Sequence, residues 1–488
     1  MPVLPRPDRT HSVTLPIRTA QEGGSCDVLV VGGGPAGIGA ALGAAATGAH
    51  TVLVERYGFL GGNATAALVT PFMSYFTERH RPERLGSHTL LPTDHGPGEP
   101  VLAGVLRRFI KRLVERGGAT APSQKTGYTV PFDPEVFKQA ALEMLDEAGV
   151  QFLFHAFASG VIGYERPKGV IFETKSGPVI IRARNIVDCT GDADIAFNAG
   201  APFEIGRDPD GLVQPMTLMF RMAEFEKTAF ENYTKQHPHE WRGVHGLWEL
   251  VRRATVDGEL DLPREDVLFF ATPHSREVIV NSTRVTRAVP LLGTDVWDLS
   301  YAEWVSRHQM RQIAAFFRHY VPGFNHSYPV QSGTEVGVRE TRRILGDYRL
   351  TEEDVLSARK FDDVVARNAY PIDVHNPRGS GTTVKRLPPG EAYDIPWRSL
   401  LPREVENLVV AGRCISGSHE AHSSYRVMPV AMALGQAGGI SAALAALKRT
   451  TPRELAVGDI QRELLRQGAD LRGIVPERNT SATATNAE

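Results

Sequence analysis

Three histidines in the last quarter of the chain are candidates for proton transfer. His419 and His422 lie three residues apart, and His375 precedes them. A neutral imidazole accepts a proton near neutral pH, so each could act as the base when an O–H, N–H or acidic C–H bond is oxidised. The alternative for each is a hydrogen-bonded structural or surface histidine. The pair could also bind a metal ion, but no other ligand cluster stands nearby, so we predict no metal site.

Arginines near these histidines could bind the substrate. Arg339 and Arg426 are candidates for clamping a carboxylate or polarising a carbonyl group, because a guanidinium donates hydrogen bonds in a planar fork. Arg342 and Arg343 are more typical of a salt-bridge network with nearby glutamates.

A glycine-rich loop near the start of the chain is typical of dinucleotide binding. The run from Gly32 to Gly37 fits the pattern GxGxxG. It follows an apolar segment at 27–31, which predicts a buried strand, and it precedes an alanine-rich segment at 36–48, which predicts a helix. A second predicted strand at 51–55 ends in Glu55, whose carboxylate could bind ribose hydroxyls. Glycines that only permit tight packing are the alternative.

Further glycines favour FAD over NAD as the cofactor. A second glycine pair follows the acidic strand within 56–63, and two later strands end at Thr190–Gly191 and Ala411–Gly412. A long, extended cofactor would contact such returning strand ends, although ordinary turn glycines would look the same. No second GxGxxG is present for NAD(P).

The cysteines argue against thiol-based redox chemistry. Cys26, Cys189 and Cys414 are far apart in the sequence, and no pair lies near Gly61 and Gly62. A disulfide scaffold, a zinc ribbon and a dithiol mechanism are therefore disfavoured.

Composition bounds the class of protein. The 488 residues carry a formal net charge of −2, without the basic excess of a nucleic-acid binder. The N-terminus has no apolar signal segment, and the most apolar stretch, 28–49, is interrupted by glycines. We therefore expect a cytoplasmic protein with no nucleic-acid partner and no membrane span.

The chain divides into segments with different patterns. We expect an N-terminal tail (1–24), a first segment of a Rossmann-type domain (25–200), an α+β substrate domain (201–400), a C-terminal return to the first domain (401–475) and a flexible tail (476–488). Helices are predicted at 101–117, 134–148 and 429–447, and strands at 150–155, 185–189 and 407–411. Residues 158–183 predict an antiparallel meander.

Several of these segments together resemble a known family. The chain is similar to FAD-dependent oxidoreductases of the glutathione-reductase-like superfamily, and within it to the bacterial family called FAD dependent oxidoreductase, loosely xanthan-lyase-like. The resemblance covers roughly residues 25–470 and rests on segments 31–37, 55–56, 58–65, 132–135, 188–194, 338–343, 370–375 and 411–429. It implies an α/β fold: a Rossmann-type FAD-binding domain, whose parallel sheet has an antiparallel meander, plus an α+β substrate domain.

The resemblance also implies which residues bind FAD. The pyrophosphate, ribose and adenine would meet Gly32, Gly34, Pro35, Ala36, Gly37, Glu55, Arg56 and Ala156. The ribityl chain and flavin would meet Gly61, Gly62, Asn63, Ala64, Thr190, Gly191, Asp192, Gly412, Arg413, Met428, Pro429 and Val430. Arg413 departs from the wider superfamily, where many relatives carry an aspartate. The helix near Pro429 is expected to point its positive N-terminus at the flavin.

The sequence thus predicts an oxidoreductase that transfers a hydride between a small organic substrate and FAD. One alternative is a monooxygenase or halogenase that uses O₂ and a separate electron donor. Another is a non-redox module of this fold that binds proteins. The substrate itself stays open.

Overall fold

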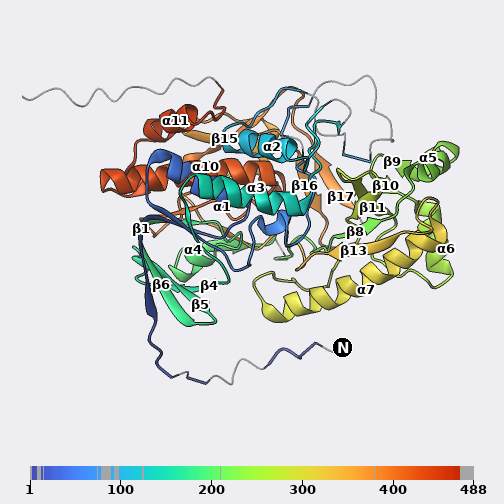
Figure 1. Ribbon diagram of the computed structural model, residues 1–488, viewed down its shortest axis with the longest axis horizontal. Coiled ribbons are helices and arrows are strands. Elements are labelled where there is room, and N and C mark those ends of the chain that lie inside the picture. The colour runs from blue at the N-terminus through green and yellow to red at the C-terminus, as the bar shows by residue number, and fades with distance from the viewer. Residues whose placement is uncertain are drawn as a thin grey trace, which may run out of the picture.

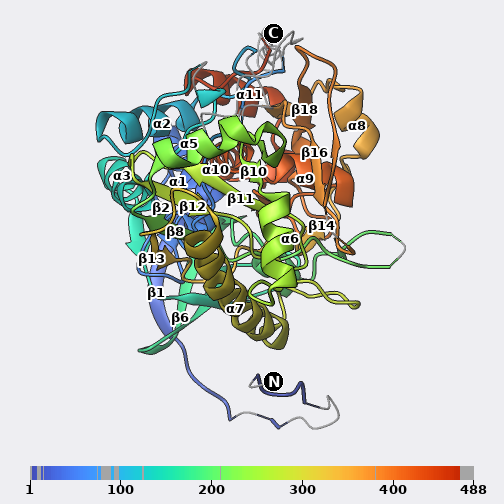
Figure 2. The same ribbon diagram turned by 90° about the vertical axis from the view of Figure 1, so that its right-hand side faces the viewer.

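The computed structural model describes residues 3–7, 13–14, 16–73, 75–78, 90–92, 98–123, 126–208, 210–379 and 381–472. The predicted C-terminal tail, 476–488, lies outside these residues, whereas most of the predicted N-terminal tail, 1–24, is described and its last four residues belong to a strand. One group of elements surrounds a sheet at the left of Figure 1, and a second group forms the right-hand end. Figure 2 views the molecule from that end.

The first sheet has seven strands within the described residues. Its order is β3 (Gln151–Leu153), β2 (Thr51–Val54), β1 (Gln21–Val31), β6 (Gly177–Asp188), β5 (Gly169–Thr174) and β4 (Phe157–Val161), and β19 (Leu408–Val410) also pairs with β6. Strands β3, β2, β1, β6 and β19 run parallel, whereas β4, β5 and β6 form an antiparallel meander. This confirms the predicted Rossmann-type sheet with its meander, and β1 begins six residues earlier than predicted.

Two glycine-rich helices cross closely on this sheet. They are α1 (Pro35–Thr47) and α10 (Met428–Lys448). A Cβ atom added at Gly39 would lie 2.1 Å from the Met432 carbonyl oxygen, and one at Gly435 would lie 1.9 Å from that of Ala36. The glycines therefore let the two backbones touch. The helices that pack nearby are α2 (Val105–Glu115), α3 (Pro134–Glu147), α9 (His419–Tyr425) and α11 (Val457–Arg466).

A second, antiparallel sheet has six strands in the described part of the chain. Its order is β13 (Tyr328–Ser332), β8 (Phe220–Ala223), β12 (Glu277–Val280), β11 (Val267–Ala271), β10 (His245–Gly246) and β9 (Trp241–Arg242). Helices α5 (Lys227–Gln236), α6 (Trp248–Val256) and α7 (Val296–Tyr320) lie beside it (Figures 1 and 2). Phe225, Phe230, Phe269 and Phe324 form the centre of its hydrophobic core.

Within the described residues, the remaining strands form three pairs, and the two remaining α-helices are short. The pairs are β7 (Phe203–Ile205) with β14 (Arg342–Ile344), β15 (Val364–Asn368) with β18 (Tyr393–Pro396), and β16 (Ile372–His375) with β17 (Thr382–Lys385). The helices are α4 (Asp194–Asn198) and α8 (Glu352–Leu356). Buried residues between Leu350 and Leu401 share one hydrophobic core with α1 and α10. The domain boundaries at residues 200 and 400 stay predictions.

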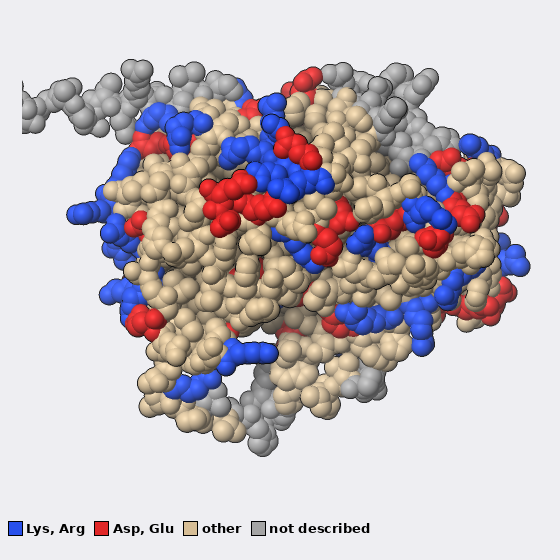
Figure 3. Space-filling view, viewed as in Figure 1, with Lys and Arg blue, Asp and Glu red and all other residues tan. Residues whose placement is uncertain are grey.

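One helix among the described residues, α10, is long and apolar enough to cross a membrane, and 89% of its most apolar window is buried inside the fold. On the face drawn in Figure 3, charges of both signs are interspersed. Ion pairs link α2 and its C-cap residue to α3: Arg112 pairs with Glu147 at 2.7 Å and Arg116 with Glu143 at 2.7 Å.

Candidate active site

A first cavity opens at the carboxyl ends of the parallel strands. Val31, Val54, Cys189 and Ala411 end or directly follow β1, β2, β6 and β19, and all four line it. Its empty volume is about 1160 Å³. This is where open α/β sheets place their ligands, because loops diverge there and leave a crevice.

Most residues that the sequence assigned to the cofactor line this first cavity. They are Gly32, Gly34, Pro35, Ala36, Glu55, Arg56, Gly62, Asn63, Ala156, Thr190, Gly191, Asp192, Gly412, Arg413 and Met428. Five others do not line it: Gly37, Gly61, Ala64, Pro429 and Val430. Gly37 lies beneath the loop, where an added Cβ atom would sit 1.8 Å from the Gly32 carbonyl oxygen.

The glycine loop presents bare backbone to the cavity. At Gly34, whose φ is −71°, an added Cβ atom would meet only the Gly62 Cα atom, at 3.7 Å. The space over Gly34 is therefore open. Gly34 is also the N-cap of α1, and no side chain caps it. Unpaired N–H groups and the positive helix end thus face the cavity, as a pyrophosphate requires.

Glu55 is held beside this loop by two backbone amides. The Gly33 N–H donates to Oε2 at 2.6 Å and the Tyr57 N–H donates to Oε1 at 3.0 Å. Burial raises the pKa of the Glu55 carboxyl, and the two amides oppose that rise. Next to it, Arg56 Nη2 donates to both carboxylate oxygens of Glu335, which belongs to the other group of elements, at 2.6 and 2.7 Å.

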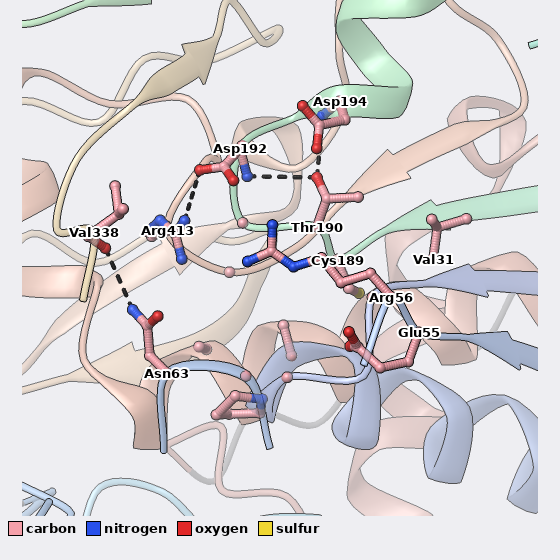
Figure 4. A pocket seen from close by; sticks show the side chains of 18 of the residues that line it. Val31, Glu55, Arg56, Asn63, Cys189, Thr190, Asp192, Asp194, Val338 and Arg413 are labelled. Carbon is pink, nitrogen blue, oxygen red and sulfur yellow. Dashed lines mark hydrogen bonds and ion pairs between the residues drawn. The ribbon is translucent and has the colours of Figure 1, made fainter. Parts of the chain in front are cut away.

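Acidic residues after β6 form the opposite wall. Asp188 Oδ2 accepts the N–H groups of Ile195 and Ala196 at the start of α4, and its Oδ1 accepts the Thr190 hydroxyl at 2.7 Å. Arg413 donates to Asp192 at 2.6 Å. In Figure 4, Glu55 lies across the cavity from Arg413 and Asn63.

Asp194 also lines the first cavity, and the sequence did not indicate it. Burial, together with the charges of Asp192 and Asp188, raises the pKa of Asp194 to about 6. Arg342 opposes this shift through an ion pair at 2.9 Å. Arg342 thus forms an ion pair, but its partner is Asp194 and not one of the nearby glutamates that the sequence suggested.

A second cavity adjoins the first. The two share Asn63, Val338, Arg413, Arg426 and Met428, so they meet at the N-terminus of α10. The second cavity has an empty volume of about 860 Å³, open solvent included. Its other lining residues include Val69, Met73, Thr217, Met219, Phe270, Asn281, Arg339, Tyr370, Asp373 and His375.

Three of the five predicted catalytic residues meet in this second cavity. Arg339, Arg426 and His375 line it together. His375 Nε2 lies 3.7 Å from Asp373 Oδ2. Burial and then the charges of Arg339 and Arg426 hold the pKa of His375 well below its usual value, so the imidazole is neutral at physiological pH.

The structure places His419 and His422 elsewhere. His419 Nδ1 lies within hydrogen-bond distance of Glu340 Oε1, at 2.9 Å in a buried position, and Glu340 also pairs with Arg343. His422 is fully buried, and neither of its ring nitrogens has a hydrogen-bond partner among the described residues. Neither histidine lines either cavity. Both side chains point into the packing around α9, which the spacing in the sequence could not reveal.

One group of metal-type side chains occurs among the described residues, His239, Glu240 and Glu249. It lies outside both cavities, and the buried Glu240 carboxylate already accepts the Glu249 backbone N–H at 3.1 Å. It carries no role in the site.

The sequence missed most of the second cavity. Asp373 and Tyr370 stand in the segment 370–375 that carried part of the resemblance, and the Tyr370 hydroxyl donates to Asp373 at 3.1 Å. Their proximity to His375 in the sequence was the available signal. Thr217, Phe270 and Asn281 come from the second sheet and its connections, and no local motif marks them.

The fold and the first cavity define a dinucleotide-binding α/β protein. Residues 27–464 match the family model described as FAD dependent oxidoreductase, and the chain belongs to this family. It is accordingly an oxidoreductase enzyme whose cofactor is FAD. No curated protein matches the chain.

Solved structures resemble the chain only distantly. One is a geranylgeranyl bacteriochlorophyll reductase-like protein from Thermoplasma acidophilum, with 13% identity, TM-score 0.42, and coverage of 92% of this chain and 85% of that one. Another is the p-nitrophenol 4-monooxygenase PnpA from Pseudomonas putida, with 11% identity, TM-score 0.41, and coverage of 91% and 84%. A third is the myxobacterial chondrochloren halogenase CndH, with 13% identity, TM-score 0.40, and coverage of 91% and 78%.

Proposed function

We propose that the enzyme transfers a hydride between a small organic substrate in the second cavity and FAD in the first. The observation that carries this proposal is the meeting of the two cavities at Asn63, Val338, Arg413, Arg426 and Met428. FAD supplies the hydride-accepting or hydride-donating ring, and the protein supplies orientation and proton handling.

The residues of the first cavity would hold FAD along its length. The N-terminus of α1 and the bare backbone at Gly34 would bind the pyrophosphate, and Glu55 would accept ribose hydroxyls. At the other end, no side chain caps the N-terminus of α10, which begins at Met428. This positive helix end would stabilise negative charge on the flavin ring.

His375 is the proposed proton acceptor. It lines the second cavity and is neutral at physiological pH, so it can take a proton when the substrate is oxidised. No hydrogen bond within the described part of the chain occupies its ring, whereas His419 is committed to Glu340. His375 therefore replaces the His419 and His422 pair as the first candidate.

Anaerobic mixing of the purified flavoprotein with a panel of hydroxy acids, amines, sugars and aromatic compounds tests the proposal. A substrate of a dehydrogenase bleaches the flavin absorbance without oxygen, and air restores it. The proposal fails if no compound bleaches the flavin, or if oxidation requires NAD(P)H and incorporates oxygen into the product. The latter result would identify the monooxygenase alternative. Family membership gives no support to the non-redox alternative.

A further inference from the structure

We propose that the second cavity binds the carboxylate of a small organic acid, with Arg339 and Arg426 as the anion site and an apolar wall for the rest of the molecule. This inference rests on the proposed function, because it names the class of substrate that would meet the flavin.

The Arg339 guanidinium has one edge that could donate hydrogen bonds to a ligand. Its Nη1 donates to the Pro215 carbonyl oxygen at 2.5 Å and to Thr217 Oγ1 at 2.6 Å. Within the described residues, Nε and Nη2 make no hydrogen bond, and neither is among the polar atoms sealed from solvent. No carboxylate of the described chain lies within 4.0 Å of this guanidinium. One edge is thus anchored and the other is open to the cavity.

Arg426 lies beside it with a weaker set of partners. Its Nη2 donates to Gln214 Oε1 at 3.4 Å and to the Asp373 carbonyl oxygen at 3.3 Å. The nearest carboxylate oxygen, Asp373 Oδ2, is 3.9 Å away. Its Nε is buried and has no partner in the part of the chain that the structure describes. A buried donor without an acceptor raises the free energy of the protein. A ligand that accepts its hydrogen bond would lower that free energy again.

The charges that line the cavity leave one positive charge unmatched. Arg413 is paired with Asp192 at 2.6 Å, so Arg339 and Arg426 face the single carboxylate of Asp373. His375 is neutral and adds nothing. Burial and the charge of Arg426 lower the pKa of Arg339 to about 9, which leaves the guanidinium protonated at neutral pH. A bound anion would relieve the repulsion between the two arginines.

One unmatched charge fits a monoanion, and the open edge of a guanidinium fits a planar carboxylate in bidentate geometry. A phosphate dianion would bring excess negative charge next to Asp373. Four apolar side chains, those of Val69, Met73, Met219 and Phe270, form part of the remaining wall, together with polar side chains such as Asn281. A short aliphatic or aromatic body would therefore bury its surface there while the carboxylate meets Arg339.

Calorimetric titration of the holoenzyme with matched acids and amides tests this site. The probes are benzoate against benzamide and 4-methylpentanoate against 4-methylpentanamide. Each pair shares its shape and differs in charge. We expect at least one acid to bind about 10- to 100-fold more tightly than its amide, since hydrogen bonds to charged groups contribute that much. Equal binding of acid and amide, or no binding of either acid at millimolar concentration, overturns the proposal.

Two variants test whether Arg339 causes the preference for acids over amides. Arg339→Gln should abolish the acid-over-amide preference, and Arg339→Lys should reduce it, because the ammonium keeps the charge but loses the fork. The matched control is Arg349→Gln, which removes an arginine paired with Glu204 outside both cavities. FAD content and the thermal unfolding midpoint show whether each variant folds. If Arg339→Gln does not fold, the binding preference of Arg339→Lys tests the role of Arg339. An unchanged preference in either Arg339 variant contradicts the proposal.

The carboxylate site and the hydride transfer can fail separately. If the acids bind in an Arg339-dependent way but no compound bleaches the flavin, the proposed function is wrong. If neutral compounds bleach the flavin while acids show no preference over amides, the carboxylate site is wrong and the function stands.

Discussion

The two adjoining cavities are built from different parts of the polypeptide. The first presents bare backbone at glycines such as Gly32 and Gly34 and at the ends of parallel strands. The second is formed by side chains from separate segments, such as Thr217, Phe270, Arg339 and His375. A backbone surface suits a cofactor that stays the same, whereas a side-chain surface can be changed for each substrate without altering the fold.

This difference predicts opposite sensitivities. An added methyl group in the first cavity should weaken FAD binding, because it fills space that the backbone leaves open. Removal of a functional group from the second cavity should slow flavin reduction or weaken substrate binding, because side chains carry out these steps there. Substitutions in the two cavities should therefore differ in whether they weaken FAD binding or slow flavin reduction, and equal effects would contradict the distinction.

The largest effect is expected from His375→Asn in the second cavity. Loss of the proposed base should lower the anaerobic flavin reduction rate by about 10²- to 10⁴-fold. FAD content should be unchanged, because His375 does not line the first cavity. Stopped-flow absorbance measures the rate, and the exposed His308, changed to Asn, is the control. A rate within threefold of the parent would rule out His375 as the base.

The next effect is expected from Gly37→Ala beneath the first cavity. The new Cβ atom would lie 1.8 Å from the Gly32 carbonyl oxygen, so the loop must shift. Overpacking of this kind costs about 1–3 kcal/mol, and we expect lower FAD content together with a lower free energy of unfolding. Gly160→Ala is the matched control, because its Cβ atom would find its nearest neighbour at an ordinary 3.6 Å. Parent-like stability and FAD content in Gly37→Ala would contradict the account of the loop.

A smaller effect concerns pH. Burial and the charges of Arg339, Arg426, Arg264 and Arg284 lower the pKa of His375, with Asp373 as the opposing neighbour. An ordinary histidine with a pKa of about 6.5 is mostly protonated at pH 6. His375 should still be neutral there and able to accept a proton. The second-order rate constant of flavin reduction at pH 6 should thus stay within about twofold of its value at pH 8. An inflection at pH 6.5 or above would contradict this assignment.

The same distinction explains how much could be predicted from the sequence. The loop at Gly32, the acid at Glu55 and the late strand end at Gly412 were recognisable because backbone sites follow local patterns of strand, turn and helix. The second cavity was only partly recognisable: Arg339, Arg426 and His375 were candidates by residue type, but Thr217, Phe270 and Asn281 join them only through tertiary packing. His419 and His422 were attractive by type and spacing, yet α9 turns both into the interior, where Glu340 and burial determine their environment.

The central claim is that FAD lies against bare backbone in the first cavity, and Gly34→Ala tests it most directly. The protein itself has room for this Cβ atom, whose nearest neighbour would be the Gly62 Cα atom at 3.7 Å, and the φ of −71° suits alanine. The unfolding midpoint of the apoprotein should therefore stay the same. The dissociation constant of FAD, measured by titrating apoprotein, should rise at least tenfold because the methyl group occupies cofactor space. An unchanged dissociation constant in this variant would contradict the account.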